Sequence, residues 1–318
     1  MSWRVVKTRA YHISPRLDPE AFVSGVATIA TENLPSDEEV RCYEERGWFI
    51  CPKILPDALL DATRVAIEAH HEGHRDHTLA VDTGFSDWQP GDGNGVRNNE
   101  FCSLQNDGVR ALALQPILGA IAARLSRSRA IRLFDDQAIY KPPNAGTNQT
   151  AVGWHTDHSY WSTCTSKRML TAWIPLHDSD ASNGTLYVVD GSHRWPEPEH
   201  VRGFNDPDLE RLSQSLGREV SPQSIIPLQL RKGQVSFHHM RTLHASGPNN
   251  SGSGRFAVAV HLQDDENHYR ACSAADGTPI VLPHDKICRR GADGMPDYTD
   301  PKTFQVLWPA QHAGSFGG

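Results

Sequence analysis

The feature that most restricts the fold of this chain is a His-x-Asp tripeptide, His155-Thr156-Asp157, followed far downstream by His244. In an extended segment, residues two positions apart point to the same side, so the imidazole and the carboxylate of this pair can face one point. His244 can reach that point only if the chain returns to it. The three residues therefore call for a fold that closes a strand carrying the pair against a segment carrying His244.

Two imidazoles and one carboxylate are the ligand set of the 2-His-1-carboxylate iron sites, which leave the opposite face of the metal open. A His-x-Asp pair alone is weak support, because such pairs occur by chance and often form a hydrogen-bonded pair in a core. His238 and His239 closely precede His244 and remain alternatives for the third ligand. The constellation predicts a metal site made of His155, Asp157 and His244.

Arg255 supplies a cation that such a site can use. The stretch Arg255–Leu262 alternates strictly, with bulky apolar side chains on one face and Arg255, Ala257, Ala259 and His261 on the other. Two alanines beside a guanidinium leave room for a ligand carboxylate, which a guanidinium binds bidentately. The alternative is an arginine on a solvated edge. The pattern favours a strand that anchors a dicarboxylate keto acid.

Four further residues are candidates for the same pocket. Gln137 and Lys141 share one face of an expected strand, and each could reach a carboxylate or a metal-bound keto acid. Lys141 is followed by two prolines, so it could instead leave the strand into solvent. Tyr160 and Trp161 follow the His-x-Asp pair and could wall a substrate pocket, although core packing explains them equally well.

Composition restricts the kind of protein. The 318 residues carry a net charge of -7 with 22% charged residues, which argues against nucleic acid as the main partner. No apolar run approaches the ~20 residues of a membrane span, and the first residues lack the apolar core of a signal peptide. The six cysteines form no close pair, which indicates free thiols in a reducing cytoplasm. We therefore expect a cytoplasmic enzyme that contacts neither membrane nor nucleic acid.

The chain divides into an N-terminal extension (1–35), a single domain (36–305) and a C-terminal tail (306–318). The domain is expected to begin with a helix that Ser36 caps and Gly47 ends, because acidic residues fill its first turn. A strand follows at Trp48–Pro52, and a second helix begins at Leu55-Pro56-Asp57. The Gly- and Asp-rich segment from Gly73 to Cys102 is expected to be a long loop. Further helices are expected at Leu112–Leu125 and Asp206–Leu216.

From Ala130 onward the pattern changes to short strands separated by turn residues. No regular alternation of strands with helices occurs, so a parallel sheet is disfavoured. The pattern predicts a mainly β protein with packed helices (α+β), built as an antiparallel sandwich or jelly roll. The expected strands are Ile131–Tyr140, Arg168–Leu176, Thr185–Val189, Val235–His238 and Phe256–Gln263.

Taken in order, these motifs resemble the phytanoyl-CoA dioxygenase family over roughly residues 36 to 270. The segments that carry the resemblance are Glu44–Ile50, His155-Thr156-Asp157, Thr171–Leu176, Asn183–Leu186, Gly191–His193, His244–Asn249 and Arg255. The resemblance implies a cupin-like double-stranded β-helix that uses Fe(II) and 2-oxoglutarate. It assigns His155, Asp157 and His244 to the iron, Arg255 and Ser246 to the far carboxylate of 2-oxoglutarate, Gln137, Lys141 and Trp173 to the co-substrate pocket, and Trp161 to the substrate side.

The resemblance also implies the reaction, an oxidation of a small organic metabolite by O2 with release of succinate and CO2. Asp157 argues against a halogenase, which needs that ligand position vacant. Three alternatives stay open: a cupin-type iron dioxygenase without keto acid, a zinc-dependent hydrolase, and a non-catalytic metal-binding protein. The first 35 residues and residues 84–99 have no family template, so the sequence leaves the substrate, the oxidation outcome and the oligomeric state open.

Overall fold

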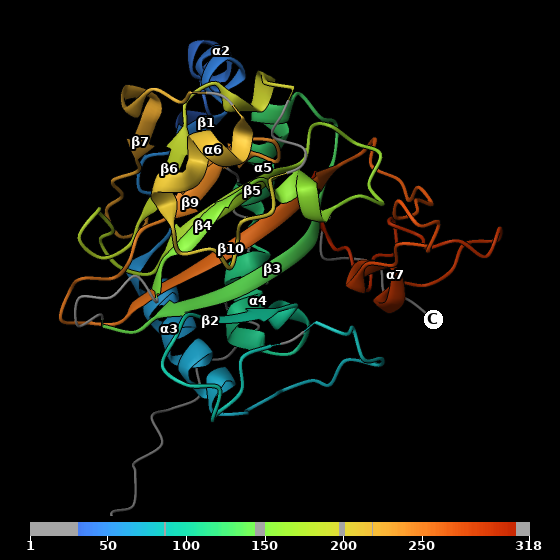
Figure 1. Ribbon diagram of the computed structural model, residues 1–318. Helices are drawn as coiled ribbons and strands as arrows, with labels where there is room; N and C mark the ends of the chain where they lie inside the picture. Colours follow the sequence, from blue (N-terminus) through green and yellow to red (C-terminus); the bar gives the residue numbers. More distant parts are fainter. Residues whose placement is uncertain (1–30, 86, 144–149, 197–200, 218, 310–318) are drawn as a thin grey trace, which may run out of the picture.

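The structure is a computed structural model that describes residues 31–309, apart from 86, 144–149, 197–200 and 218. Most of the predicted extension and residues 310–318 of the predicted tail therefore lie outside the described residues. Two antiparallel sheets form the body of the protein, and helices cover one side of the larger sheet (Figure 1). The predicted jelly roll with packed helices is confirmed.

Among the described residues, the larger sheet has seven strands and the smaller sheet has four. In spatial order the larger sheet contains β1 (Trp48–Ile50), β8 (Ser236–His239), β5 (Leu170–Pro175), β10 (Arg255–Asp264), β3 (Ile131–Lys141) and β11 (Val306–Trp308), and β2 (Arg97–Glu100) also pairs with β3. The smaller sheet contains β4 (Val152–His155), β9 (His244–Ser246), β6 (Leu186–Val189) and β7 (Ile225–Pro227).

Local sequence explains how the first helices begin and end. Helix α2 (Asp37–Arg46) starts at Ser36, whose side chain accepts a hydrogen bond from the Glu39 amide, while the Glu39 carboxylate accepts from the Ser36 amide. Gly47 ends it with φ 80°, a left-handed conformation that glycine adopts without strain. Helix α3 (Asp57–His71) follows Pro56. Both helices match the expectation from the sequence.

The prediction of a single helix at Leu112–Leu125 is wrong, because two helices occupy this region. Helix α4 (Asp107–Ala113) stops before Gln115, and Pro116 opens α5 (Pro116–Ser126). Proline lacks an amide hydrogen and disfavours helical backbone in the residue before it, so it suits a first position and interrupts a longer helix. The stretch Asp107–Ser126 is long and apolar enough for a membrane span by length and composition, contrary to our expectation. Its apolar residues pack into the core, which accounts for the composition.

Two short strands lie where the sequence indicated irregular structure. Strand β2 falls inside the expected loop Gly73–Cys102, and the Arg97 guanidinium lies 4.1 Å from the Trp88 ring and 4.8 Å from the Tyr140 ring. Strand β11 falls inside the expected tail and pairs with β3. Both strands are short and add edges to β3, so neither carries a strong alternating pattern. Helices α6 (Leu212–Leu216) and α7 (Pro283–Ile287) are also short.

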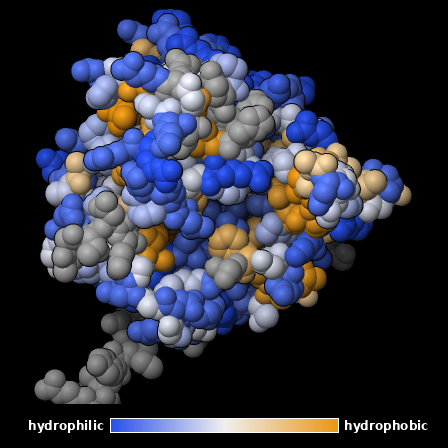
Figure 2. Space-filling model, viewed as in Figure 1, coloured by the Kyte–Doolittle hydropathy of each residue, from blue (hydrophilic) through white to orange (hydrophobic). Residues whose placement is uncertain are grey.

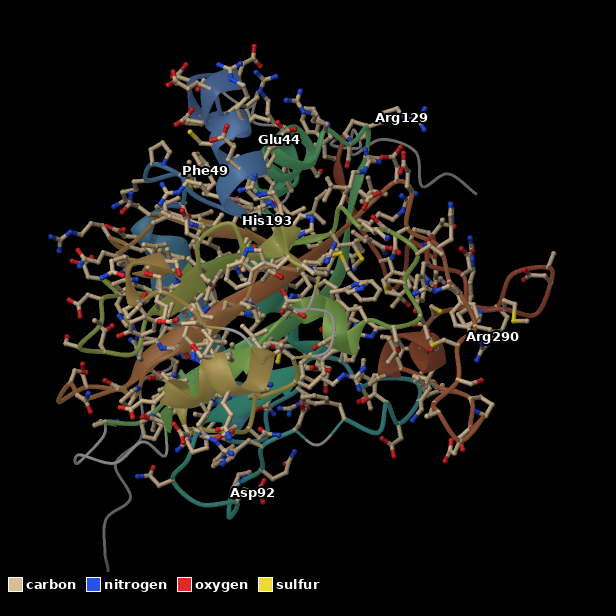
Figure 3. The ribbon with its side chains drawn as sticks, turned by 45° about the horizontal axis from the view of Figure 1, so that its top comes forward. Glu44, Phe49, Asp92, Arg129, His193 and Arg290 are labelled. Atoms are coloured by element: carbon tan, nitrogen blue, oxygen red, sulfur yellow. The ribbon has the colours of Figure 1, made fainter. Side chains whose placement is uncertain are left out.

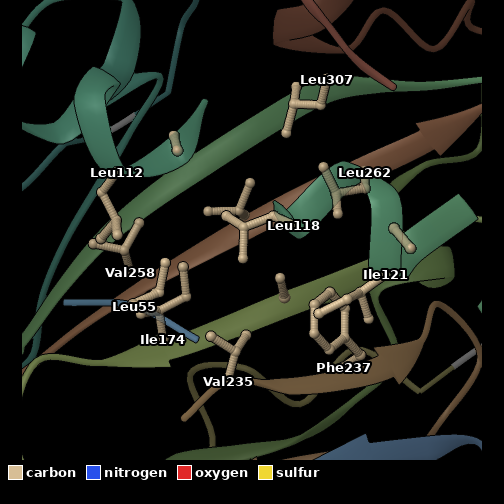
Figure 4. Close-up of a cluster of buried hydrophobic side chains, with 14 of the residues drawn as sticks. Leu55, Leu112, Leu118, Ile121, Ile174, Val235, Phe237, Val258, Leu262 and Leu307 are labelled. Carbon is tan, nitrogen blue, oxygen red and sulfur yellow. The ribbon is translucent and has the colours of Figure 1, made fainter. Parts of the chain in front are cut away.

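The hydrophobic core lies between the larger sheet and helices α3, α4 and α5. Figure 4 shows Leu118 and Ile121 of α5 packed with Val258, Ile174 and Phe237 from three strands. Successive residues of a strand face opposite sides. The neighbours of these apolar residues therefore project from the inner face, toward the smaller sheet, and this face carries the polar residues of the site.

Candidate metal centre and co-substrate pocket

Three buried side chains meet between the two sheets. His155 ends β4, His244 begins β9, and the two residues pair directly across the smaller sheet. Thr156 has extended backbone, so Asp157, which opens the short 3-10 helix η4 (Asp157–Tyr160), lies on the same side as His155. One ligand atom from each of His155, Asp157 and His244 lies within 4.8 Å of the others. The fold thus brings together the three residues predicted as metal ligands.

Each imidazole is oriented by a backbone carbonyl. His155 Nδ1 lies 2.8 Å from the Gly153 carbonyl oxygen, and His244 Nδ1 lies 3.0 Å from that of Thr242. Because a carbonyl only accepts, each Nδ1 carries the hydrogen and each Nε2 keeps its lone pair for a metal. Burial lowers the pKa of both rings, which keeps them neutral as metal ligation requires.

Asp157 is held through the oxygen that faces away from His244. Its Oδ1 lies 3.5 Å from His244 Nε2, while Oδ2 accepts a 2.5 Å hydrogen bond from the Thr171 hydroxyl. That hydroxyl has one hydrogen, so it accepts from His261 Nδ1, which lies 2.8 Å away. Burial acts to raise the pKa of Asp157, but the imidazoles of His244 and His238 outweigh it and hold the pKa well below its usual range. Asp157 is therefore a charged carboxylate with one oxygen directed at the metal position.

His238 is a site residue that the sequence left only as an alternative ligand. Its ring centroid lies 4.3 Å from that of His244, and its Nε2 lies 3.3 Å from Asp157 Oδ2. It is 1% exposed and lies beside the triad instead of replacing His244. His239 faces the other way, with Nε2 2.9 Å from the Lys167 carbonyl oxygen. Successive strand residues face opposite sides, so the adjacent pair His238-His239 indicated that one of the two histidines would face the site.

The donor set fits a ferrous ion. Two neutral imidazoles and one carboxylate approach from one side, and the cavity on the other side is open to further ligands. The cavity is lined by Gln137, Ile139, Val152, Trp173, Leu186, Phe204, Ser246, Arg255 and Ala259, besides the residues around Asp157. A bidentate co-substrate would bind in this cavity.

Arg255 lines this cavity as a buried cation. It is 1% exposed, and its Nε and Nη1 donate no hydrogen bond to any residue between 31 and 309 that the structure describes. Its guanidinium carbon lies 5.5 Å from the centre of the Trp173 ring. Burial lowers the pKa of Arg255 to about 9, so it remains charged at neutral pH. A buried cation without an anion is costly, and a ligand carboxylate would complete the site.

Lys141 is buried, so the alternative of a solvent-exposed lysine is wrong. Its Nζ donates to Ser246 Oγ at 2.5 Å, to the Gly247 carbonyl at 2.7 Å and to the Ser246 carbonyl at 3.1 Å. An ammonium has three donors, and these contacts occupy all of them. Lys141 therefore fixes Ser246 beside Arg255 and has no donor left for the co-substrate.

The remaining candidates lie in different surroundings. Gln137 and Trp173 line the cavity, whereas Trp161 is 4% exposed and packs on His261 and Phe134, in the core beyond it. Tyr160 is 37% exposed, with its ring 6.0 Å from that of His155. The Phe204 ring lies closer to that of His155, at 5.1 Å, and no pattern in the sequence predicted this contact. It comes from an irregular segment, where no periodicity indicates which side chain turns inward.

A jelly roll that places two histidines of one sheet, an aspartate just beyond that sheet and a buried arginine of the other sheet around one cavity is typical of a non-haem iron, 2-oxoglutarate-dependent oxygenase. A family model for phytanoyl-CoA dioxygenase (PhyH) matches residues 43–257, and the chain belongs to this family. The family predicted from the motifs is confirmed, together with the enzyme class.

Individual proteins agree with this assignment. The peroxisomal phytanoyl-CoA dioxygenase of Bos taurus is 28% identical over 246 residues, which cover 74% of this chain and 71% of that protein. The crystal structure of the non-haem α-ketoglutarate-dependent carbocyclase SnoK, from nogalamycin biosynthesis, is 28% identical with a TM-score of 0.58, covering 79% of this chain and 95% of that one.

A further structure shows the same fold with ligands. The epimerase SnoN, in complex with Fe3+, α-ketoglutarate and nogalamycin RO, has a TM-score of 0.61 at 22% identity and covers 91% of this chain and 100% of that one. Iron and 2-oxoglutarate are the cofactor and co-substrate of this class of enzyme, as expected from the motifs.

Proposed function

We propose that this protein oxidises a small organic molecule by hydroxylation, coupled to conversion of 2-oxoglutarate and O2 into succinate and CO2. The observation that carries the proposal is the buried guanidinium of Arg255, whose Nε and Nη1 have no acceptor among the described residues, in the same cavity as the His155, Asp157 and His244 triad. A zinc hydrolase or a simple metal-binding protein has no use for a buried cation at this place. A dicarboxylate keto acid accounts for both features.

Each residue has a role in this reaction. His155, Asp157 and His244 would hold the iron, which when bound supplies the oxygen-activating chemistry. Arg255 and Ser246 would bind the far carboxylate of 2-oxoglutarate and so orient its keto-acid end toward the triad. Thr171 keeps Asp157 in one orientation through its hydroxyl hydrogen bond. Phe204 shields His155 on the substrate side.

The test is succinate formation by purified protein supplied with Fe(II), 2-oxoglutarate and a metabolite panel. We expect Asp157→Ala and His155→Ala to abolish succinate release, and Arg255→Ala mainly to raise the apparent KM for 2-oxoglutarate. Asp61→Ala, at an exposed acid on α3, is the control and should leave both parameters unchanged. Full turnover by Asp157→Ala would reject the triad. Product formation without succinate would instead identify an iron dioxygenase that uses no keto acid.

We also propose that the protein works in the cytoplasm. All six cysteines are free, and Cys51, Cys102, Cys164 and Cys288 are buried as thiols. Unpaired cysteines suit a reducing compartment. Fractionation of source cells with an antibody against the chain tests this, and recovery in an oxidising or membrane-bound compartment would contradict it.

A further inference from the structure

Two acidic side chains project from the inner face of the larger sheet beside the metal cavity. Glu100 of β2 lies directly opposite Gln137 of β3, and Asp135 of β3 lies directly opposite His261 of β10. Gln137 and His261 both line the cavity that contains the triad. Because directly opposite residues share a sheet face, Glu100 and Asp135 project from the cavity side.

The two carboxylates are only partly satisfied. Glu100 Oε1 accepts a 2.9 Å hydrogen bond from Gln137 Nε2, and Asp135 Oδ2 lies 3.0 Å from His284 Nε2. Asp135 is 3% exposed, yet its Oδ1 accepts no hydrogen bond from the described part of the chain. Within that part, neither acid forms an ion pair with a lysine or arginine. The pair is therefore a buried acceptor site that lacks a cation.

The surroundings make negative charge on Glu100 and Asp135 unfavourable in the absence of a neighbouring cation. Burial, and then the proximity of Asp135, raise the pKa of Glu100 well above its usual range. Burial, and then the neighbouring Asp136, do the same to the pKa of Asp135. An opposite charge within a few ångströms favours the ionised form of a carboxyl group and removes this penalty.

The position of the pair relates it to the substrate. Along the inner face of β3, Lys141 marks the co-substrate end, Gln137 lies beside the triad, and Asp135 lies two residues further from Lys141. Arg255 pairs with Lys141, so a keto acid bound to Arg255 would occupy the end of the cavity opposite to the acids. Figure 2 shows a hollow with a largely hydrophilic floor near the centre of the face presented in Figure 1.

We propose that Glu100 and Asp135 form a subsite for a protonated amine, so that the substrate class is small organic amines. The inference rests on the proposed function, because it assigns the substrate of that same site. The ammonium would donate to Asp135 Oδ1 and to the Glu100 carboxylate, which holds a neighbouring carbon near the iron position. An acyl-CoA thioester, with its several negative charges, is disfavoured at such a subsite.

The experiment is calorimetric titration of the full-length protein loaded with Mn(II) and 2-oxoglutarate in the absence of oxygen. The probes are three amines, each compared with its alcohol: benzylamine with benzyl alcohol, cyclohexylmethylamine with cyclohexylmethanol, and n-butylamine with n-butanol. We expect at least one amine to bind about tenfold or more tightly than its alcohol. Glu100→Gln and Asp135→Asn should each reduce that ratio to within about twofold.

Asp92→Asn provides the matched control, since Asp92 is an exposed acid on the loop that precedes β2, at the outer edge in Figure 3. It should keep the amine preference. Glu100 is less buried than Asp135, so Glu100→Gln alone can test the subsite if Asp135→Asn fails to fold. No preference for any amine, or a preference that survives both variants, would overturn the amine subsite. Absence of succinate release with every compound would instead count against the proposed function, and the binding ratios would still decide the subsite.

Discussion

The orientation of Asp157 depends on residues outside the predicted set of metal ligands. Its Oδ2 accepts a hydrogen bond from the Thr171 hydroxyl, which in turn accepts one from His261 Nδ1. These contacts leave Oδ1 as the oxygen that faces His155 and His244. Hydrogen-bond partners of this kind fix the geometry of a ligand and commonly contribute one to two orders of magnitude to metal affinity.

Replacing Thr171 by valine should therefore weaken metal binding by about 10- to 100-fold with little change in fold. The shape of the side chain is preserved, and the hydroxyl that holds Asp157 is lost. Mn(II) titration followed by calorimetry measures the effect. Thr63→Val is the control, because the Thr63 hydroxyl is equally buried but bonds to the Leu59 carbonyl in α3. Equal Mn(II) affinity in the wild type and Thr171→Val would show that this hydrogen bond does not orient Asp157.

A second residue-scale prediction concerns His71, at the end of α3. It is 3% exposed and packs against the Trp88 ring at 5.7 Å. Burial, and then the nearby Arg97, lower the pKa of His71 to about 4. An unfolded histidine has a pKa of about 6.5, so between about pH 6.5 and 4 the unfolded chain binds the proton that the folded chain excludes. Stability is lost as the pH falls through this window.

His71→Gln should flatten this dependence, lowering the slope of unfolding free energy by up to about 1.4 kcal/mol per pH unit. Urea unfolding of the metal-free protein between about pH 5 and 7.5 gives the slopes. The exposed His268 offers a control, since His268→Gln should leave the slope as it is in the wild type. An unchanged slope in His71→Gln would mean that the ring takes up a proton in the folded state.

The sequence was sufficient to predict that His155, Asp157 and His244 meet and that Arg255 faces the same cavity, because their chemistry is specific and their spacing follows strand geometry. The sequence could not show that Thr171, His261 and His238 lie around Asp157, because the register between strands decides which side chains meet. Lys141 illustrates the same limit. Its type and position were compatible with a co-substrate contact, and only the three acceptors around its Nζ show that it holds Ser246.

At the scale of elements, α2 and α3 were predictable because their ends carry capping and helix-starting residues. Strands β2 and β11 were not, because each has four residues or fewer and gains its stability from pairing with β3. The break between α4 and α5 was indicated by Pro116, which we read as a residue within one helix. Long-range pairing, which no local pattern encodes, accounts for the missed elements.

Strand β11 makes a close contact that can be tested. A Cβ added to Gly119 of α5 would lie 2.5 Å from the Leu307 Cβ and 2.8 Å from its carbonyl carbon, so the helix and strand would have to separate. Alanine usually favours a helix interior over glycine by up to about 1 kcal/mol. We nevertheless expect Gly119→Ala to destabilise the protein by at least about 1 kcal/mol, because overpacking outweighs propensity here.

Thermal or urea unfolding measures this effect, with Gly95→Ala as its control. An added Cβ at Gly95 meets nothing within 4 Å, so that variant should be neutral or slightly more stable. If Gly119→Ala were also neutral or stabilising, α5 would not pack on β11 as the structure has it, and residues 306–308 would belong to the tail that we expected from the sequence.

At the scale of the whole molecule, the active site lies between the two sheets. His155 and His244 come from the smaller sheet, whereas Arg255 and Trp173 come from the larger sheet. A keto acid that binds the metal at one end and Arg255 at the other connects the sheets. Ligand binding should therefore stabilise the folded protein in two steps, one for the metal and a further one for 2-oxoglutarate.

The size of each step follows from mass action. A ligand at 100 times its Kd adds about 2.7 kcal/mol to the unfolding free energy, and at a concentration equal to its Kd it adds about 0.4 kcal/mol. Suppose that Arg255→Ala weakens 2-oxoglutarate binding about 100-fold and that the ligand is supplied at 100 times its wild-type Kd. The stabilisation by 2-oxoglutarate should then fall from about 2.7 to about 0.4 kcal/mol, while the stabilisation by Mn(II) is retained. Arg129→Ala, at a peripheral arginine whose side chain is 92% exposed (Figure 3), should keep both steps. A full 2-oxoglutarate step in Arg255→Ala would place the far carboxylate elsewhere, and the connection between the sheets would then have to come from another residue of the larger sheet.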